Sequence, residues 1–164
     1  MNVTVPASFA FLIFCSVFAQ PKPNLDDPLI LKDILSVAVT SLEEREMPNG
    51  SLLFFEPQQD RPFTGWRKRC RKNGQVRVLK QFKDGKAHGP YTYWWENGKK
   101  AEQKYNLVGR AHGRWTNWYE NGQMQLQQTV RFGKIEGPAS RWYKSGAKKD
   151  DSVYADGKII SVVV

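Results

Sequence analysis

The side chains best suited to acid–base chemistry stand at a fixed spacing in this sequence. His88 and His112 are its two histidines, and each directly precedes a glycine. Glu96 and Glu120 are also 24 residues apart, and each directly precedes Asn-Gly. A general acid or base is one residue held at one place beside a substrate, whereas these residues are copies of one position in a repeat. We therefore interpret both pairs as structural residues of turns.

Other arrangements that carry chemistry are missing from the sequence. It contains no phosphate-binding glycine loop, no nucleophile elbow and no metal-ligand spacing. Of its two cysteines, Cys15 lies in an N-terminal apolar run, and we interpret Cys70 as a small apolar filler in a sheet. The sequence therefore predicts a protein that is not an enzyme, with no cofactor, no metal and no small-molecule substrate.

The elements that position these residues are copies of one unit of 24 residues, repeated across residues 63–149 without an insertion or a deletion. The recurring positions are Asn73-Gly74, Asn97-Gly98, Asn121-Gly122 and Ser145-Gly146; Gly65, Gly89, Gly113 and Gly137; Gly85, Gly109, Gly133 and Gly157; and the pairs Cys70-Arg71, Trp94-Trp95, Trp118-Tyr119 and Trp142-Tyr143. Constant spacing of this kind is typical of a repeat array, in which each unit packs against its neighbours.

Each unit has the pattern of a β-hairpin. Asn-Gly between two alternating, aromatic-rich runs favours a type I′ turn, which needs positive φ at both central residues. In one copy, residues 90–96 and 99–106 form the two strands. The predicted structural turn residues are Gly74, Gly98, Gly122 and Gly146. We therefore predict an all-β fold: an elongated antiparallel meander of tandem 24-residue β-hairpins, with a short N-terminal helix.

Residues 1–19 are predicted to be a signal peptide, which implies an exported protein in the periplasm, in the envelope or outside the cell. The apolar run 9–19 is too short to span a bilayer as a helix, and Val17 and Ala19 suit a cleavage site. Residues 1–8 contain no Lys or Arg, which such signals usually carry. An uncleaved anchor and a buried N-terminal segment are the alternatives.

Residues 20–48 are predicted to form a linker and a short helix. Asp27 suits the N-cap, Pro28 suits the first helical position, and apolar residues at helical spacing favour a helix within residues 28–44. A β-branched run at 37–40 weakens its second half. The array is predicted to fill residues 49–164. Asn49-Gly50 and residues 52–55 make a divergent leading half-unit, and residues 159–164 a closing strand.

Charge is unevenly distributed along the chain. The net charge is +9, but residues 63–149 hold 20 Lys and Arg against 5 Asp and Glu, a net +15, and the remainder has 5 against 11, a net −6. A basic sheet with acidic ends favours an anionic partner or a self-neutralising flank. Solubility is the simpler explanation, because Lys and Arg also keep exposed strands from pairing with other chains.

Aromatic residues are predicted on both faces of the sheet, since successive strand residues point to opposite sides. One face collects Trp94, Trp118 and Trp142. The other is the candidate binding surface, with the residues Arg71, Tyr93, Trp95, Trp115, Tyr119, Arg141 and Tyr143. An aromatic face that stays open beside Arg and Lys is a recognition surface. The alternative is a ladder of rings that only pack copy on copy.

The run Trp118 to Gln123, the run His112 to Trp115 and the start Pro62-Phe63-Thr64-Gly65 together resemble the MORN repeat in its bacterial variant form. The tandem hairpins also resemble proteins labelled as YwqK-family toxin–antitoxin antitoxins. The resemblance covers about residues 51–158 and implies a twisted antiparallel sheet of hairpins. For function, it implies a scaffolding or protein-binding platform, and some such arrays are tied to acidic phospholipids. Cys70-Arg71 and Ser145 depart from the pattern.

These observations lead to one functional prediction and two alternatives. The prediction is a non-catalytic binding or scaffolding module whose partner is another protein. The first alternative is a binder of an anionic surface, either phospholipid headgroups or an acidic polymer, through Lys and Arg. The second is an antitoxin, which requires a cytosolic location. Nucleic acid is disfavoured because the predicted export keeps the protein away from it.

Overall fold

The computed structural model describes residues 23–163, so the predicted signal peptide and Cys15 lie outside the described residues. Within that range the elements are, in chain order, α1 (Pro28–Val37), β1 (Glu43–Glu46), β2 (Leu52–Phe55), β3 (Gly65–Cys70), β4 (Val76–Lys83), β5 (Lys86–Trp94), β6 (Lys100–Leu107), β7 (Arg110–Ala111), β8 (Gly113–Trp118), β9 (Met124–Arg131), β10 (Lys134–Trp142), β11 (Lys148–Ala155) and β12 (Lys158–Val163).

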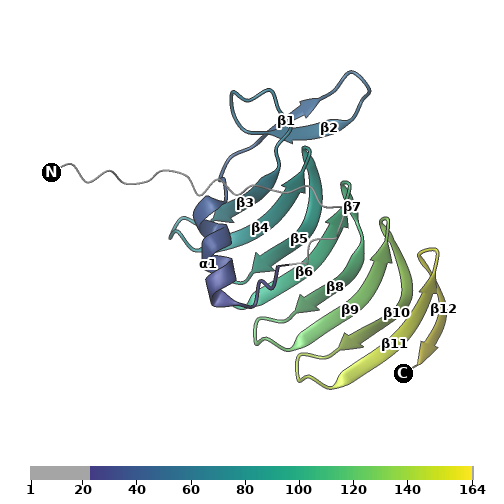
Figure 1. Cartoon of the computed structure of the whole chain (residues 1–164). Coiled ribbons are helices and arrows are strands. Elements are labelled where there is room, and N and C mark those ends of the chain that lie inside the picture. Colours follow the sequence, from purple (N-terminus) through teal and green to yellow (C-terminus); the bar gives the residue numbers. More distant parts are fainter. Residues whose placement is uncertain (1–22, 164) are drawn as a thin grey trace.

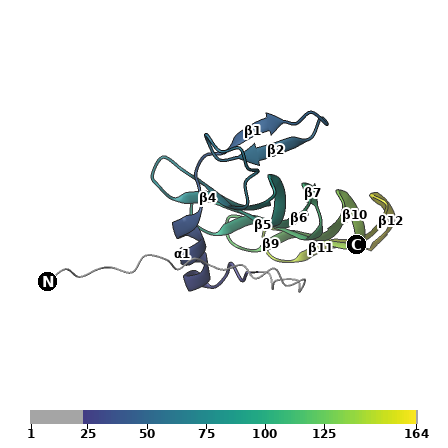
Figure 2. The same cartoon turned by 45° about the horizontal axis from the view of Figure 1, so that its top comes forward.

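A single antiparallel sheet of ten strands contains the whole repeat array (Figure 1). Its strands lie in the order β12-β11-β10-β9-β8-β6-β5-β4-β3, and the short β7 pairs with β6 beside this path. Each strand is therefore bonded to its neighbours in sequence, and Figure 2 shows the sheet as one layer with the helix on one side. The predicted all-β meander of hairpins with a short N-terminal helix is confirmed.

The Asn-Gly corners are hairpin bends, but their geometry differs from the prediction. In one copy Gly98 N donates to Trp95 O at 3.1 Å and Trp95 N donates to Lys99 O at 2.8 Å. Gly98 has φ 80°, whereas Asn97 is not among the residues with positive φ. Each corner is thus a three-residue loop, a type I turn followed by a left-handed glycine, and the predicted type I′ turn is wrong. Asn97 Oδ1 instead accepts from Lys99 N at 3.0 Å and fixes the loop.

The type I′ geometry occurs at the opposite end of the strands. There the residue before each glycine of the third column also has positive φ, as in the pairs Asp84-Gly85, Val108-Gly109, Phe132-Gly133 and Asp156-Gly157. Two residues at positive φ define the two-residue type I′ turn. Val108 and Phe132 adopt this conformation at φ 48° and 47° and remain 59% and 50% exposed. A β-branched residue in this region is strained.

The helix α1 begins where the sequence predicts and ends earlier. Asp27 Oδ1 accepts from Leu29 N at 2.9 Å, which makes Asp27 the N-cap, and Pro28 is the first helical residue. The helix stops at Val37, because Val39 exchanges backbone hydrogen bonds of 2.8 Å with Trp66 and Lys68 on β3. Residues 38–44, which were expected to continue the helix, are therefore extended or irregular.

A small apolar core holds the helix against the sheet. Its buried members are Leu25, Ala38, Leu79 and Trp94, with Leu31, Ile34, Leu35, Trp66 and Val76 packed around them. Lys68 Nζ donates to Leu35 O at 2.7 Å, so a cation from the sheet binds one of the last carbonyls of the helix. The helix therefore covers the N-terminal part of one sheet face.

The leading half-unit folds as a hairpin but stays outside the ten-stranded sheet. β1 and β2 form their own two-stranded sheet, and their loop repeats the bond pattern of the Asn-Gly corners. The hairpin packs through Phe54, whose ring meets that of Phe82 at 5.1 Å. Gly85 allows this approach, because a Cβ there would lie 3.0 Å from Leu53 Cβ. Phe54 N also donates to Gly85 O at 2.9 Å.

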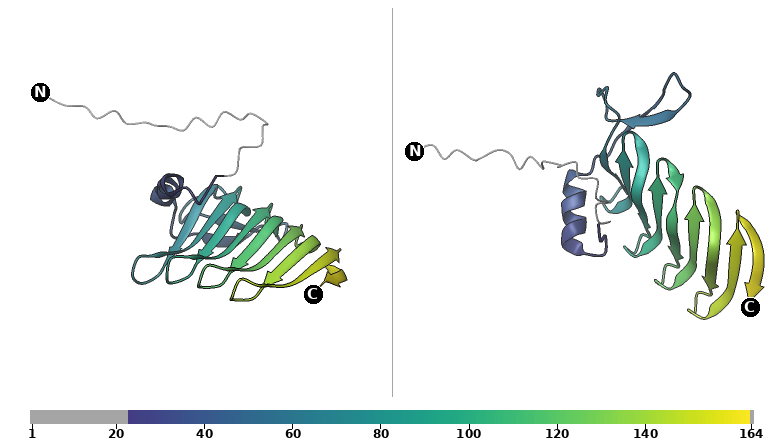
Figure 3. Two further views of the ribbon diagram at one scale, coloured as in Figure 1. Left: turned by 90° about the horizontal axis from the view of Figure 1, so that it is seen from below. Right: turned by 45° about the vertical axis from the view of Figure 1, so that its right-hand side comes forward.

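The two edges of the sheet differ in their protection, and Figure 3 shows them at opposite ends of the array. At the β3 edge, Val39 bridges Arg67 and the helix lies alongside. At the other edge, β12 is exposed at every residue, including Ile160 at 65% and Val163 at 68%. The predicted closing strand is therefore present, and it leaves an apolar edge open to solvent.

Candidate binding face

The strand register separates the sheet into two faces, because directly opposed residues of antiparallel strands share a face. The helix face carries the row Lys68, Leu79, Thr92, Gln103, Thr116, Gln127, Ser140 and Asp151. The open face carries two rows. The first contains Arg67, Lys80, Tyr91 and Lys104, then Trp115, Gln128, Ala139 and Ser152. The second contains Arg69, Val78, Tyr93, Glu102, Asn117, Leu126, Arg141 and Asp150.

The helix face is largely occupied in its N-terminal part. Leu79 and Thr92 are fully buried, and Trp94 is buried in the core beneath α1. The acidic segment before the helix also reaches this face, where Asp26 forms an ion pair with Lys100. Small polar residues fill most of the rest of the row, and the partly buried Trp118 and Trp142 lie on the same face.

Cations and aromatic rings alternate on the open face across β4, β5, β6 and β8. Lys104 Nζ lies 4.5 Å from the ring centre of Tyr91 and 4.9 Å from that of Trp115, so one ammonium group bridges two rings. Arg77 lies over the ring of Tyr93 at 5.3 Å. Each such contact stabilises a partly desolvated cation through the negative ring face. The rings therefore fix the positions of the cations above them.

Positive charges crowd at the β3–β4 end of this face. Arg67 is directly opposite Lys80 in the register, and Arg69 is two residues further along β3. Burial lowers the pKa of Lys80 below its usual value, and the neighbouring cations Lys104, Arg67 and Arg69 lower it further, whereas Glu44 opposes the shift. Burial, and then Arg69, also lowers the pKa of Arg67. The smaller contributions of the neighbouring cations to both pKa shifts reflect the close approach of like charges at this end of the face.

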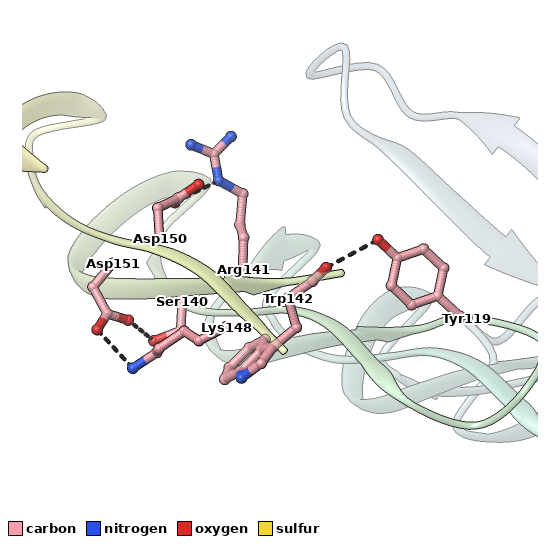
Figure 4. A network of polar contacts seen from close by, with 7 residues as sticks. All are labelled: Tyr119, Ser140, Arg141, Trp142, Lys148, Asp150 and Asp151. Atoms are coloured by element: carbon pink, nitrogen blue, oxygen red, sulfur yellow. Dashed lines mark hydrogen bonds and ion pairs between the residues drawn. The ribbon is translucent and has the colours of Figure 1, made fainter. Parts of the chain in front are cut away.

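Carboxylates neutralise the other end of the open face (Figure 4). Arg141 Nε donates to Asp150 Oδ1 at 2.8 Å, and Asp150 is buried. This hydrogen bond raises the pKa of Arg141. Across the sheet, Asp151 accepts from Ser140 and from Lys148, and these bonds lower the pKa of Asp151. Among the cations of the two open-face rows, those without an ion pair therefore lie at the N-terminal end.

Three residues of the sequence-predicted surface donate hydrogen bonds to the backbone of the next hairpin. Trp95 Nε1 donates to Trp118 O at 3.1 Å, and Tyr119 Oη donates to Trp142 O at 2.9 Å. Arg71 Nη2 donates to the equivalent carbonyl of Trp94 at 2.8 Å. Arg71 thus replaces the aromatic donor of later copies and makes the same bond, so the departure at Cys70-Arg71 leaves the contact between units intact.

The other predicted surface residues are distributed along the open side. Tyr93 and Trp115 lie together on the open face, where Arg77 and Lys104 cover their rings. Arg141 shares the face but is paired with Asp150. Tyr143, in the last copy, is 52% exposed with Lys149 over its ring at 5.7 Å. The structure therefore brings the rings of Tyr93 and Trp95 together, with centres 6.1 Å apart, and places Trp115 on the same face.

Sequence reasoning missed the cations Arg67, Arg69, Lys80 and Lys104. A signal for them exists in the columns of the repeat, because Arg67, Tyr91, Trp115 and Ala139 are 24 residues apart, as are Lys80, Lys104, Gln128 and Ser152. These two columns alternate along one row of the sheet. Tabulating each column for charge would have revealed a gradient from basic to neutral along the array.

Of the polar residues first considered for catalysis, Glu96 and Glu120 lie in the hairpin turns, whereas His88 lies within strand β5 and His112 between β7 and β8. Glu136 Oε2 accepts from Asp156 N at 2.9 Å, at the repeat position that His88 and His112 occupy in earlier copies. His112 packs on Phe132 with ring centres 4.8 Å apart. Among residues 23–163 there is no group of three or more His, Cys, Asp or Glu side chains that could hold a metal ion. The same range contains no helix of the length and apolar character needed to cross a membrane.

Two stretches of the chain, residues 87–105 and 111–131, match the MORN repeat variant family. The first runs from β5 into β6 and the second from β7 through β8 to β9, so each match covers one hairpin and the two begin 24 residues apart. A comparison with curated proteins finds no match. The chain therefore contains MORN-type repeats.

Proposed function

We propose that this chain of MORN-type repeats is a non-catalytic module that binds another protein on the open face of its sheet. The observation that carries the proposal is the half-buried cluster of Tyr91, Tyr93 and Trp115, held in place by Lys104 and Arg77. Aromatic residues and arginine dominate binding energy at protein interfaces, because they bury large areas at low entropic cost.

The asymmetry of the sheet supports this choice of face. The helix face is covered by α1 around Leu79 and Trp94, and beyond that it carries Thr, Gln and Ser together with the partly buried Trp118 and Trp142. On the open face the small hairpin β1–β2 packs at one end and leaves the ring cluster beside it uncovered by any other described element. The rings and cations best suited to bind a partner therefore lie next to this hairpin.

Site-specific photo-crosslinking in the native host tests the proposal. A photoreactive phenylalanine derivative at Asn117 faces the open side, and the same group at the exposed Thr129 faces the helix side. We expect one protein to be crosslinked from position 117 and not from position 129. Trp115→Ala in the first variant should then abolish that crosslink. Crosslinks from both positions, or only from position 129, would reject the open face as the interface.

An anionic surface is the second candidate, and the crowded cations at Arg67, Arg69 and Lys80 favour it. It predicts that the chain co-sediments with vesicles containing an anionic lipid and is released by added salt. Neutral vesicles serve as the control. Binding to anionic vesicles together with no crosslinked protein would favour this candidate over a protein partner.

We also propose that the chain acts outside the cytosol. The apolar run of residues 9–19, with small residues at 17 and 19, supports export. Fractionation of the host, with detection of a C-terminally tagged chain, tests this location. Recovery of the chain only in the cytosolic fraction would reject it and would favour the antitoxin alternative.

A further inference from the structure

Four cations at the β3–β4 end of the open face have no matching carboxylate. Arg67, Arg69 and Arg77 have no Asp or Glu oxygen within 4.0 Å anywhere in residues 23–163, and the same holds for Lys80. The Nε of Arg67 is buried without a hydrogen-bond partner. Like charges directly opposite each other on paired strands destabilise a sheet. The Arg67–Lys80 pair therefore costs stability in the free protein.

The chain itself indicates the chemistry that this cluster accepts. The carboxylates that face it are Glu102, which binds Lys104 at 2.9 Å, and Glu44 of β1, which interacts electrostatically with Lys80. β1 is an acidic strand, Glu43–Glu46, and three of its four residues are glutamates. An acidic extended segment thus already lies at one margin of the cluster, and it leaves Arg67 and Arg69 without a counter-ion.

The rings beside the cluster are unsuited to stacking with a nucleobase. Lys104 covers the faces of Tyr91 and Trp115, and Arg77 covers Tyr93. Proteins that bind single-stranded nucleic acid present open ring faces to successive bases. Here the groups that point outward from the rings are ammonium and guanidinium donors, which favour a ligand made of oxyanions without flat bases.

We infer that Arg67, Arg69 and Lys80 form a docking site for an acidic, extended segment of the protein partner, with carboxylates completing the ion pairs that the sheet leaves open. This inference rests on the proposed function and names the chemistry of the partner. Guanidinium groups bind carboxylates through two parallel hydrogen bonds, and such charge-assisted bonds are the strongest in proteins. The site is specific because Glu102 and Asp150 neutralise the cations further along the face.

The spacing of residues along β3 sets the pattern of acids that fits. Arg67 and Arg69 are two residues apart on β3, so they share a face and lie about 7 Å apart, and Lys80 on β4 is opposite Arg67. Carboxylates at alternate positions of an extended segment are also about 7 Å apart. The expected pattern is therefore Glu-x-Glu, in a segment that runs along β3.

Peptide binding to the full chain tests the inference. The probe is a synthetic peptide of alternating Glu and Ser, and its control is the same peptide with Gln in place of Glu. We expect only the acidic peptide to bind, as measured by titration calorimetry at physiological ionic strength. Lys80→Gln should raise the Kd of this peptide about tenfold, the effect of losing one charge-assisted hydrogen bond. Lys144→Gln removes the same charge at an exposed hairpin corner and should change the Kd less than twofold.

Thermal unfolding without peptide separates a lost site from a damaged fold. Lys80→Gln removes a like-charge pair but also the contacts of Lys80 Nζ with the rings of Phe82 at 4.9 Å and Phe54 at 5.9 Å, so this variant should melt close to the temperature of the unchanged protein. Equal binding of the two peptides, or equal losses in Lys80→Gln and Lys144→Gln, would overturn the inference. Binding of single-stranded DNA or anionic vesicles in preference to the peptide would also overturn it. A crosslink from Asn117 that survives Lys80→Gln would refute this site and leave the proposed function standing.

Discussion

Tyr119→Phe should destabilise the array by removing one hydrogen bond between repeats and nothing else. The Tyr119 hydroxyl donates to the Trp142 carbonyl at 2.9 Å in a partly buried position, and the ring itself is unchanged by the substitution. A hydrogen bond of this kind contributes about 1 kcal/mol to the free energy of unfolding. For a domain of this size, that loss corresponds to a decrease of about 3 °C in Tm. Urea denaturation followed by tryptophan fluorescence measures the change.

Tyr143→Phe provides the matched control for this prediction. Tyr143 occupies the same repeat position one unit later, and its hydroxyl has no hydrogen-bond partner among residues 23–163. The same chemical change there should alter the free energy of unfolding by less than about 0.5 kcal/mol. Equal effects of the two substitutions would refute the idea that this hydrogen bond joins consecutive hairpins. A stabilised Tyr119→Phe variant would refute it as well.

Three further predictions concern the turns and the edge of the sheet. Val108→Asn should raise the free energy of unfolding by about 1 kcal/mol, because asparagine tolerates the positive φ that strains valine; an unchanged denaturation midpoint would argue against strain. Gly98→Val should lower Tm more than Glu96→Ala, since Gly98 has φ 80°; equal Tm values would contradict the turn assignment. Ile160→Lys should reduce light scattering at high protein concentration by placing a charge on the bare edge of β12, and scattering equal to that of the unchanged protein would exclude this edge as the site of self-association.

The repeat itself could be predicted because its period is visible in the sequence without any structural knowledge. The type of turn could not, since Asn-Gly is compatible with two kinds of hairpin loop. In the three-residue loop, Asn97 supplies a side-chain acceptor and only Gly98 needs a positive φ. The corners with two positive φ values carry Asp84 and Asp156 in two copies but Val108 and Phe132 in the others. These two apolar residues hide the usual signal of a type I′ turn.

The helix end was predicted wrongly because the apolar residues of the range 28–44 make two different kinds of contact. Leu31, Ile34 and Leu35 pack on the core from the helix. Beyond Val37, Val39 instead forms a parallel bridge with Arg67, so its backbone groups bond to the sheet edge. The unpaired backbone groups at the sheet edge therefore compete with the helix for the backbone of residues 38 and 39. The local sequence does not show that these edge groups lie nearby.

The candidate site was only partly foreseeable from the sequence. Tyr93 and Trp115 were placed on the correct face by alternation alone. The cation cluster depends on which residues of β3 and β4 stand opposite each other, and that register includes a bulge between Arg69 and Cys70. Counting charge over residues 63–149 gave the sign of the net charge of the sheet but could not show where on the sheet the cations gather. The location follows only once strands are paired.

Within each repeat, some residues join the hairpins and others line the open face, which explains how a repetitive fold can carry a binding site at one place. The bonds that join hairpins run from residues 71, 95 and 119 to backbone carbonyls of the next unit, so they require no particular side chain in the unit that accepts them. The side chains of the accepting unit can therefore vary while these bonds are kept. One column accordingly changes from Arg67 to Tyr91, Trp115 and Ala139 with no change in register. Because the first three members of this column carry charge or rings and the last, Ala139, carries neither, we place recognition toward the β1–β2 hairpin, and the last units extend the sheet.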